Sequence, residues 1–515
     1  MGKLKNDLGW QKSSSCLKYL YGGMMVAVLL LLCFKDFFPR AARYYLMPEI
    51  GCSYVWLLLC GVTLLVLLHA ICRLLFRKVQ NGKYAALWLG LVFLLLQWLL
   101  VYNYYFETEW DVQQLVGAAQ ASACGDWMAL QSFSWYFSEC PNNLFLTSLF
   151  AQIFKVGGWI GLQGIFPLLA LQCLLGIVVS WMLFQTIFRC YGFATAFFGQ
   201  LLYLLFVGLS PWFSIPYSDT FSLFFCMGMV WLALTSVLEK KPGLQWFLLS
   251  FFAGVGYAVK PQILFVFLAL LLVRFPRAGR KGLPLLKKWF RSASLPLIII
   301  GFIASMLITT VAGNAMGILR NTDRAFGMTH YLLMGMNSRT MGDYAPEDVV
   351  FSREYPTRLA RAEAELRETG RRISDMAVFG FCRHICEKTI LTYGDGTFSW
   401  GKEGLFFKTI YPEKNNPISS VTRKIYYTKD YGGVYFPIYC HFALILWLGI
   451  IFFGMVGSFL SSDPMVKTVC IALLLLALFE MLFECRARYL FGFTPLYILC
   501  ACAGLKEEVK RFKRL

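Results

Sequence analysis

The chain has 515 residues, of which 58% are hydrophobic, 17% aromatic and only 15% charged. A soluble domain carries roughly a quarter charged residues, so this composition excludes an ordinary soluble protein and indicates a membrane protein. The net charge of +19 does not indicate a nucleic-acid partner, because multi-pass membrane proteins collect Lys and Arg on their cytoplasmic loops. We therefore expect the lipid bilayer as a partner and no binding of nucleic acid.

Apolar windows of about 20 residues, the length with which a helix crosses the hydrocarbon, recur along the whole chain. Backbone amides must be paired inside the membrane, and strand-like alternation is absent, so we expect an all-α fold. The windows predict about 12 spans. They lie within 142–188 and near residues 19–36, 53–74, 84–106, 191–209, 219–238, 244–259, 261–274, 293–313, 437–460, 466–484 and 489–505. The stretch 142–188 makes either one span or three, which gives about 12 to 14 crossings.

The distribution of basic residues predicts the side on which each loop lies. Lys and Arg cluster in the C-terminal tail and at residues 1–18, 73–83 and 274–291. By contrast, residues 102–142 contain five acidic residues and no Lys or Arg. We therefore expect both termini in the cytoplasm and the acidic segment outside. The long segment 314–436 is basic, but long segments translocate regardless of their charge, so it is also expected outside.

This path through the cell membrane divides the chain into five segments. They are N-terminal spans at 1–106, an outer acidic loop with an interfacial helix at 107–143, a central transmembrane bundle at 144–313, an extracytoplasmic cap at 314–436, and C-terminal spans with a basic cytoplasmic tail at 437–515. Lys260 and Pro261 separate two short spans of the central bundle. This predicts a helical hairpin whose apex lies at the outer surface.

The cap segment has its own local patterns. It contains a charged stretch with helical character, Tyr355–Arg372, followed by an apolar stretch, Met376–Ile390. Gly and Asp then occupy turn-forming positions between aromatic residues in Thr392–Trp400. We expect a small folded domain above the bundle, which either covers a site or only connects spans.

The 17 cysteines lie mostly within predicted spans, where cysteine packs as a small hydrophobic residue. No CxxC pair occurs, and Cys382 and Cys386 have no second pair of ligands nearby, so we expect no zinc site. Cys124 and Cys140 are both expected outside the membrane. They form either a disulfide or two free thiols, and we favour the free thiols.

The acidic loop is the first candidate for chemistry. Apolar residues recur there with helical spacing opposite more polar positions: Val112, Leu115, Val116 and Ala119 against Asp111, Gln114 and Ala118. Such a helix lies flat in the membrane interface, and a carboxylate on its polar face can deprotonate a hydroxyl as a general base. The alternative is a solvated loop whose acidic residues only keep it outside, and composition alone favours that alternative.

Ionisable residues near the outer face are the second candidate, because a charge at that depth is costly unless it is paired or functional. They are Asp219, Lys260, Glu480, Glu484, Arg486 and Arg488. The two arginines either pair with Glu480 and Glu484 as structural salt bridges or bind an anion such as a lipid phosphate. No carboxylate lies close to Lys260 in the sequence, so the case for anion binding is stronger there.

The order of the motifs resembles that of the GT-C membrane glycosyltransferases. It is most similar to the protein-O-mannosyltransferase-like (family 39-like) branch, in a version found in Gram-positive bacteria. The motifs that carry the resemblance are Trp110–Leu115, Tyr136–Asn143, Pro211–Asp219, Gly254–Pro261 and Arg488–Leu490, with Pro495 beyond them. The likeness extends over residues 84–505. Two departures are the additional spans before the acidic loop and Cys140-Pro141-Asn142-Asn143 in place of a Tyr-Pro-Pro motif.

The resemblance implies a GT-C-like bundle that transfers a sugar from a polyprenyl-phosphate donor to an acceptor hydroxyl at the outer face. It implies Asp111 as the catalytic base, with Glu109 and Glu107 as alternatives. It also implies that Lys260, Arg486 and Arg488 bind the donor phosphate. The residues expected to line the acceptor and sugar pocket are Gln114, Tyr136, Asn142, Asn143, Tyr217 and Asp219.

The sequence specifies neither the sugar nor the acceptor, which is an envelope glycopolymer, a lipid or a protein. No cofactor is expected, because basic side chains can neutralise the donor phosphate, but dependence on a divalent metal stays open. Intramembrane charges and broken helices also occur in transporters and lipid flippases, which are the main alternative. A non-catalytic partner in envelope assembly is the third.

Overall fold

The computed structural model describes the backbone of residues 8–44, 51–79, 82–235, 241–274, 294–403 and 406–512, and the side chains of residues 15–44, 51–79, 82–235, 241–274, 295–403 and 406–506. Regular structure in these ranges is almost entirely α-helical, apart from short 3-10 segments, a π-helix and the strands β1 (Phe106–Glu107) and β2 (Thr409–Ile410). Nine of the described helices are long and apolar enough to cross a membrane. The predicted class, an all-α multi-pass membrane protein, is confirmed.

Each predicted span has a helix at its place. The candidate spans are α1 (Leu8–Cys33), α3 (Tyr54–Leu75), α4 (Lys83–Tyr104), α9 (Phe166–Tyr191), α13 (Pro242–Val259), α16 (Ser294–Asn314), α21 (Phe436–Leu460), α22 (Pro464–Leu482), and η9 (Ala487–Phe493) continued by α23 (Thr494–Phe512). Shorter apolar helices are α10 (Phe193–Tyr203) with the π-helix η4 (Leu204–Gly208), α11 (Ser218–Ala233), and η6 (Pro261–Ile263) with α14 (Leu264–Arg274). The predicted hairpin is present, because α13 and α14 pack together on either side of Lys260.

Residues 142–188 contain η3 (Pro141–Asn143), α8 (Leu144–Trp159) and most of α9. Only α9 among these is long enough to be a candidate span. Instead of crossing the bundle, α8 packs against α5 (Asp111–Cys124) and α16. Of the two arrangements predicted for this region, the structure therefore agrees with one span and not with three.

Glycine residues allow α21 to pack closely against α23 and against α3. An added Cβ at Gly457 of α21 would lie 2.4 Å from the carbonyl oxygen of Cys500, and one at Gly504 of α23 would lie 2.1 Å from that of Phe453. Gly61 of α3 meets α21 in the same way at Gly449. Small residues at helix contacts are typical of membrane bundles, where close backbone packing replaces the hydrophobic effect.

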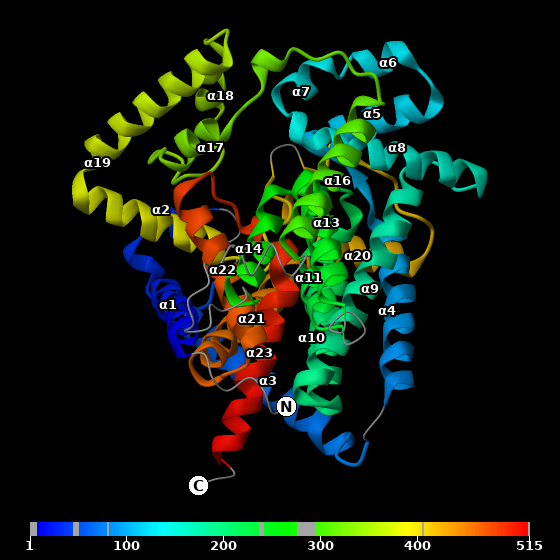
Figure 1. Cartoon of the computed structure of the whole chain (residues 1–515). Helices are drawn as coiled ribbons and strands as arrows, with labels where there is room; N and C mark the ends of the chain where they lie inside the picture. The colour runs from blue at the N-terminus through cyan, green and yellow to red at the C-terminus, as the bar shows by residue number, and fades with distance from the viewer. Residues whose placement is uncertain are drawn as a thin grey trace.

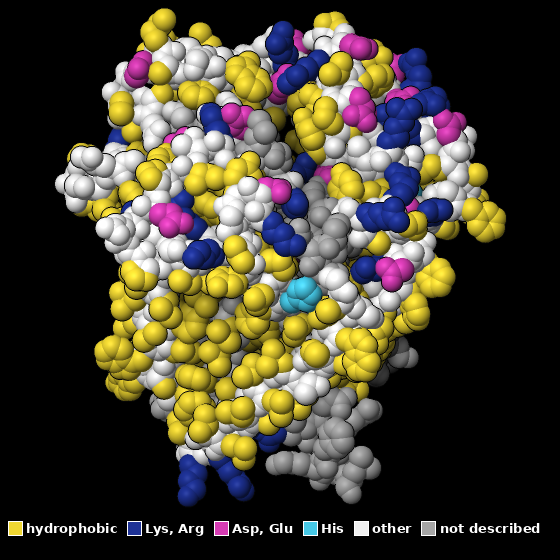
Figure 2. Space-filling view, turned by 180° about the vertical axis from the view of Figure 1, so that it is seen from behind, with side chains coloured by type: hydrophobic (Ala, Val, Ile, Leu, Met, Phe, Trp, Pro, Cys, Tyr) yellow, Lys and Arg dark blue, Asp and Glu magenta, His cyan; other side chains and the backbone are white. Residues whose placement is uncertain are grey.

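Hydrophobic side chains form a broad band around the lower half of the molecule, whereas Lys, Arg, Asp and Glu crowd its upper part (Figure 2). The lower end shows Lys and Arg but, in this view, no Asp or Glu. The end of α23 and the connection between α3 and α4 lie at that lower end (Figure 1). The predicted basic cluster at 274–291 lies outside the described residues except for Arg274, as do Lys3, Lys5, Lys513 and Arg514.

Most of the two segments predicted to lie outside the membrane is found at the upper end of the molecule, whereas α20 of the cap segment lies lower, beside the spans (Figure 1). The acidic segment forms α5, α6 (Trp127–Gln131) and α7 (Ser134–Glu139). The cap forms η7 (Thr322–Arg324), α17 (Met328–Gly335), α18 (Pro346–Arg353), α19 (Arg358–Tyr393), α20 (Pro417–Tyr426) and η8 (Lys429–Tyr431). Other short helices are η1 (Lys35–Phe37), α2 (Pro39–Ala42) and η5 (Pro211–Ser214).

Direct bonds join the acidic segment to the cap. Arg353 of α18 donates two hydrogen bonds to the Glu139 carboxylate at the end of α7, at 2.8 and 2.7 Å. The backbone amide of Phe326 donates to the carbonyl of Glu139 at 2.9 Å. Strands β1 and β2 pair antiparallel, with Phe106 opposite Ile410. These strands were not predicted, because two residues are too short for an alternating pattern to be recognised.

The charged and apolar stretches predicted in the cap form the two limbs of one helix, α19, which bends at Ala377. The backbone of Ala377 has a φ of +48°, a conformation that is strained for a residue with a side chain. The second limb is fastened to α17 through the carbonyl of Gly335, which meets Nε2 of His384 at 2.8 Å and Nζ of Lys388 at 2.7 Å. Lys388 also donates to the carbonyl of Phe483 at 2.7 Å, so this limb connects the cap to the end of α22.

Replacing Gly457 by Val should destabilise the bundle by about 1–3 kcal/mol, because the branched side chain must push the α23 backbone away. Thermal unfolding of the detergent-solubilised protein, followed by tryptophan fluorescence, measures the change. Gly23 of α1 provides the matched control, since an added Cβ there meets no atom within 4 Å. Equal losses of stability for Gly457→Val and Gly23→Val would contradict the proposed packing.

Acid should weaken the attachment of α19. Burial lowers the pKa of His384 to about 4, whereas an unfolded histidine titrates near 6.5. The unfolded state therefore binds more protons between these values, and stability falls as the pH is lowered from about 6.5 toward about 4. Glutamine does not titrate, and its side-chain amide keeps a donor for the carbonyl of Gly335. His384→Gln should therefore reduce the fall in the free energy of unfolding between pH 7 and pH 5 by about 2 kcal/mol. Identical unfolding profiles of both proteins across this range would contradict the assignment.

Candidate functional site

Asp111 is the first residue of α5, at the upper end of the bundle. A helix N-terminus stabilises a negative charge, and Tyr217 adds a hydrogen bond from its hydroxyl to Oδ2 of Asp111 at 2.7 Å. Burial raises the pKa of Tyr217, and the charge of Asp111 raises it further, so this hydroxyl stays protonated and donates. Sequence reasoning placed both residues at the site, and the structure brings them into contact.

The apolar face of α5 follows the predicted spacing. Val112, Leu115 and Ala119 are buried, and Val116 is partly buried. The prediction for Ala118 was wrong, because Ala118 is fully buried although the spacing placed it on the polar face. The reason is that α8 packs against α5, so more than one face of the helix is covered.

Three of the other predicted pocket residues lie close together, one in α7 and two in η3. Nδ2 of Asn143 donates to the hydroxyl of Tyr136 at 2.6 Å, and Nδ2 of Asn142 donates to Oδ1 of Asn143 at 3.3 Å. Burial raises the pKa of Tyr136, and the charge of Asp111 raises it further. Asn142 is exposed, and Gln114 lies half-buried one turn after Asp111.

Arg488 packs against two aromatic rings, and one of them, Tyr217, bonds Asp111. Its guanidinium carbon is 4.5 Å from the centre of the Trp110 ring and 5.3 Å from that of Tyr217. The side chain is nine-tenths buried, yet Nε and Nη1 have no hydrogen-bond partner within the described residues. Buried guanidinium nitrogens are normally hydrogen-bonded, so Arg488 can accept an anionic ligand.

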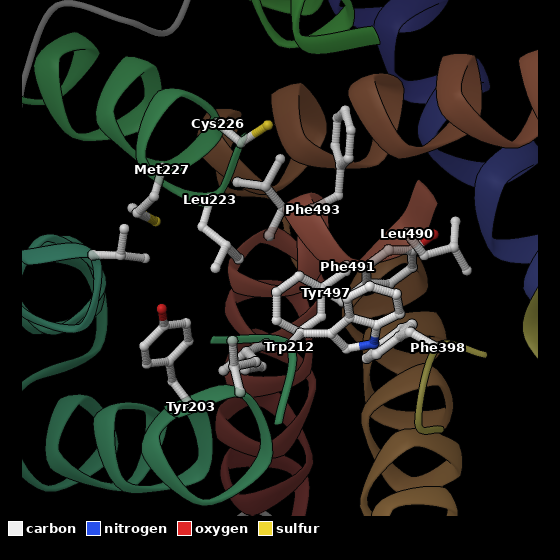
Figure 3. Packing of buried hydrophobic residues seen from close by; sticks show 14 of the residues in the cluster. Tyr203, Trp212, Leu223, Cys226, Met227, Phe398, Leu490, Phe491, Phe493 and Tyr497 are labelled. Carbon is white, nitrogen blue, oxygen red and sulfur yellow. The ribbon is translucent and has the colours of Figure 1, made fainter. Parts of the chain in front are cut away.

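The backbone that carries Arg488 is held from below by aromatic packing. Phe491 of η9 lies against Phe398 of the cap, with ring centres 5.5 Å apart, and against Trp212 at 6.3 Å (Figure 3). Nε1 of Trp212 donates to the carbonyl of Thr397 at 3.0 Å. Gly492 permits this approach, since an added Cβ would lie 2.5 Å from Cβ of Ser222 on α11.

Arg486 is bound mainly by carboxylates. Its Nε lies 3.0 Å from Glu484 and 3.2 Å from Asp343, and its Nη1 bonds Glu403. The predicted pair with Glu484 is present, but Glu480 accepts only the backbone amide of Arg486, at 3.3 Å. The structural interpretation of this residue is thus the better supported one.

Sequence reasoning missed Glu403 and Asp343, which lie in the cap. Oε1 of Glu403 is 3.6 Å from Nε of Arg488, so Glu403 contacts both arginines. Burial raises the pKa of Glu403, and the charges of Arg486 and Arg488 oppose that rise. No local pattern reveals this pairing, because 83 residues separate Glu403 from Arg486.

Lys260 has no carboxylate close to it in the sequence, but the structure supplies one from a distant part of the chain. Nζ of Lys260 bonds Oδ1 of Asp219, and both side chains are buried. The two residues are 41 positions apart, and the hairpin brings them together. Asp219 therefore acts as the counter-ion of Lys260, whose Nζ also lies 4.5 Å from the ring centre of Tyr489. Oδ2 of Asp219 is buried and has no hydrogen-bond partner in the described part of the chain.

The alternative carboxylates of the acidic loop point elsewhere. Glu109 pairs with Lys408 at 3.5 Å, and Glu107 accepts a hydrogen bond from the hydroxyl of Tyr411 at 2.6 Å. Both partners belong to the cap and lie near β2. Of the three carboxylates weighed as a base, Asp111 is the one hydrogen-bonded to a residue that packs beside Arg488.

Among the described residues, no group of three or more His, Cys, Asp or Glu side chains is arranged to hold a metal ion. Cys124 and Cys140 are free thiols, which agrees with the favoured alternative. Burial raises the pKa of the Cys140 thiol, and the charges of Asp111 and Glu139 raise it further.

A family model described as "Conserved hypothetical integral membrane protein" matches residues 9–509, which is nearly the whole chain. No curated protein matches the chain, and no solved structure matches it. The match covers every candidate span and every residue of the site. The chain therefore belongs to this family of conserved hypothetical integral membrane proteins.

Proposed function

We propose that the protein is a membrane glycosyltransferase that moves a sugar from a polyprenyl-phosphate donor to an acceptor hydroxyl outside the cytoplasm. One observation carries this proposal: Tyr217 contacts both a carboxylate and a buried arginine. Its hydroxyl bonds Asp111, and its ring lies against Arg488, whose Nε and Nη1 have no hydrogen-bond partner among the described residues. A transferase of this kind needs a base for the acceptor and a cation for the leaving phosphate. The order of motifs that resembles GT-C enzymes supports the same assignment.

In the proposed reaction, the acceptor hydroxyl oxygen attacks the anomeric carbon of the sugar while the bond from that carbon to the phosphate oxygen breaks. The electron pair leaves with the polyprenyl phosphate, and Arg488 stabilises its charge. The hydroxyl proton moves to Asp111. Since Tyr217 occupies Oδ2, we assign Oδ1 as the proton acceptor. Direct attack on the opposite face inverts the configuration of the anomeric carbon.

The remaining site residues support this arrangement in different ways. Aromatic rings at Trp110, Tyr217 and Tyr136 offer flat apolar surfaces for a sugar, and Asn143 offers a polar edge. Arg486 and Lys260 each have a buried carboxylate partner. We therefore assign them to neutralising the buried carboxylates around Arg488 rather than to direct contact with the phosphate.

We also propose a topology of about twelve crossings, formed by the nine candidate spans and the three shorter apolar helices. Both termini then lie in the cytoplasm, and the acidic segment and the cap lie outside. Two features support this orientation: the basic lower end and the shared position of α5–α7 and α17–α19 at the upper end. A polyprenyl donor then reaches the site from the outer leaflet.

Asp111→Asn should reduce sugar transfer by about 100-fold to 10,000-fold, because the amide cannot accept the proton. Purified protein in vesicles, supplied with a radiolabelled polyprenyl-phosphate sugar and an envelope extract as acceptor, gives the readout. Glu109→Gln, a matched loss of one charge from the same loop, should retain transfer. Full activity of a correctly folded Asp111→Asn protein would show that Asp111 is not the base, and loss of activity in Glu109→Gln alone would transfer the role to Glu109.

Removing the Arg488 charge should weaken use of the donor by about 10-fold to 100-fold in kcat/KM, the value of a charge-assisted hydrogen bond. Arg488→Gln alone leaves Glu403 short of a partner and risks misfolding. The charge-neutral pair Glu403→Gln with Arg488→Gln avoids this, and Glu403→Gln alone serves as the control that keeps Arg488. If the paired variant uses the donor as well as the control does, Arg488 does not bind the phosphate.

The same vesicles also test the main alternative function. A lipid or solute that crosses the bilayer without consumption of the donor would favour a flippase.

A further inference from the structure

Four exposed arginines gather where the first span meets the cap. Arg40 and Arg43 belong to α2 and its end, Arg339 follows α17, and Arg383 lies on the second limb of α19. Nη2 of Arg40 donates to the carbonyls of Ser338 and Arg339, at 2.6 and 2.9 Å, which holds these elements together. We call this surface the α2–α19 corner.

The charge of the corner is only partly balanced. Glu387, itself buried, lies 3.2 Å from Arg383 and 4.0 Å from Arg40. In the part of the chain that the structure describes, Arg43 and Arg339 form no ion pair with a carboxylate. Among the described residues, the corner therefore carries an excess of positive charge that can meet an anion.

Exposed aromatic and aliphatic residues flank these arginines. The Phe37 side chain, just past the end of α1, is 78% exposed, and Phe34 beside it is also exposed. At the bend of α19, Val378 and Phe379 project outward, and Phe379 is 91% exposed. The strained backbone of Ala377 holds this bend, so the structure maintains the exposed apolar tip at a cost in stability.

The corner lies at the height where a membrane would end. The 3-10 helix η1 and α2 follow directly after the span α1, and α19 packs against both α1 and α2. Figure 1 places α2 and the bend of α19 on one side of the molecule, and Figure 2, seen from behind, shows Lys and Arg on that side directly above the hydrophobic band. Phosphate groups of a bilayer lie at this level, and acyl chains lie just below it.

We propose that the α2–α19 corner is a binding site for anionic phospholipid headgroups. Its arginines bind the phosphates, and the aromatic residues of η1 and of the α19 bend enter the boundary with the acyl chains. Arginine suits phosphate because its planar fork donates paired hydrogen bonds. A soluble polyanion would satisfy the arginines but leave Phe37 and Phe379 in water, so a lipid fits both halves of the surface. This inference is independent of the proposed glycosyl transfer.

Lipid titration of the full-length protein in neutral detergent tests the proposal. Phosphatidylglycerol is added in one arm, phosphatidylcholine in a second and inorganic phosphate in a third, and the thermal midpoint and the number of bound lipids by native mass spectrometry are recorded. Phosphatidylglycerol alone should raise the midpoint and remain bound. An equal effect of phosphatidylcholine would overturn the requirement for negative charge, and an equal effect of inorganic phosphate would overturn the requirement for a lipid.

The charged half is tested with Arg40→Gln, Arg43→Gln and Arg339→Gln together. Affinity for phosphatidylglycerol should fall by roughly fivefold for each arginine removed, or about 100-fold in all. The matched control removes three exposed arginines from elsewhere in the cap, as Arg324→Gln, Arg358→Gln and Arg367→Gln, and should bind normally. Equal affinities of the two triple variants would overturn the assignment of the site.

The apolar half is tested with Phe379→Ser against Leu359→Ser, a residue 85% exposed on the first limb of α19. Phe379→Ser should weaken phosphatidylglycerol binding severalfold, because it removes an aromatic side chain from the lipid boundary, whereas Leu359→Ser should not. Unchanged binding in Phe379→Ser would overturn the part assigned to the bend.

Discussion

The contact between Glu403 of the cap and the two arginines before α23 is the interaction on which the upper half of the molecule depends. Arg486 and Arg488 are buried where few waters can reach, so their charges require carboxylates, and the spans supply only part of them. The cap provides Glu403 and Asp343, while Glu484 comes from the end of α22. Backbone bonds reinforce this junction, because the amide of Glu484 donates to the carbonyl of Tyr331 and that of Cys485 to the carbonyl of Gly342. These contacts therefore join the cap firmly to the spans.

The carboxylates neutralise the two arginines unequally, and this difference distinguishes Arg488 from Arg486. Arg486 meets three carboxylates, whereas Arg488 meets one at ion-pair distance and otherwise faces aromatic rings. The two neighbouring arginines therefore differ: Arg486 contacts three carboxylates and so holds the cap, whereas Nε and Nη1 of Arg488 have no hydrogen-bond partner among the described residues. Lys260 repeats the first pattern with Asp219. In the proposed reaction, the hydrogen-bond donors of Arg488 stabilise the charge that develops on the leaving phosphate.

Sequence reasoning found the features that follow from local periodicity. The spans, the hairpin at Lys260, the helix that starts at Asp111 and the charged helix of the cap all have a repeat that membrane burial or helical spacing imposes. It missed what only tertiary contact creates. Glu403 and Asp219 become counter-ions across 83 and 41 residues. Ala118 is buried because α8 covers a second face of α5, and β1–β2 pairs strands too short to show alternation. The residue types of the site and the helices that carry them were thus predictable, but their pairings were not.

The second limb of α19 has a mechanical consequence. It runs over residues 377–393, about 25 Å at the usual helical rise, from the exposed tip at the bend to Gly394, whose carbonyl accepts a hydrogen bond from Tyr54 at the start of α3. Along its length it is fixed to Gly335 and Phe483, beside the residues that position Arg486. The limb therefore connects the exposed tip directly to this junction. With the tip in the lipid boundary, as proposed, a bilayer whose thickness differs from the hydrophobic band tilts the limb, so membrane thickness acts on the position of Arg486.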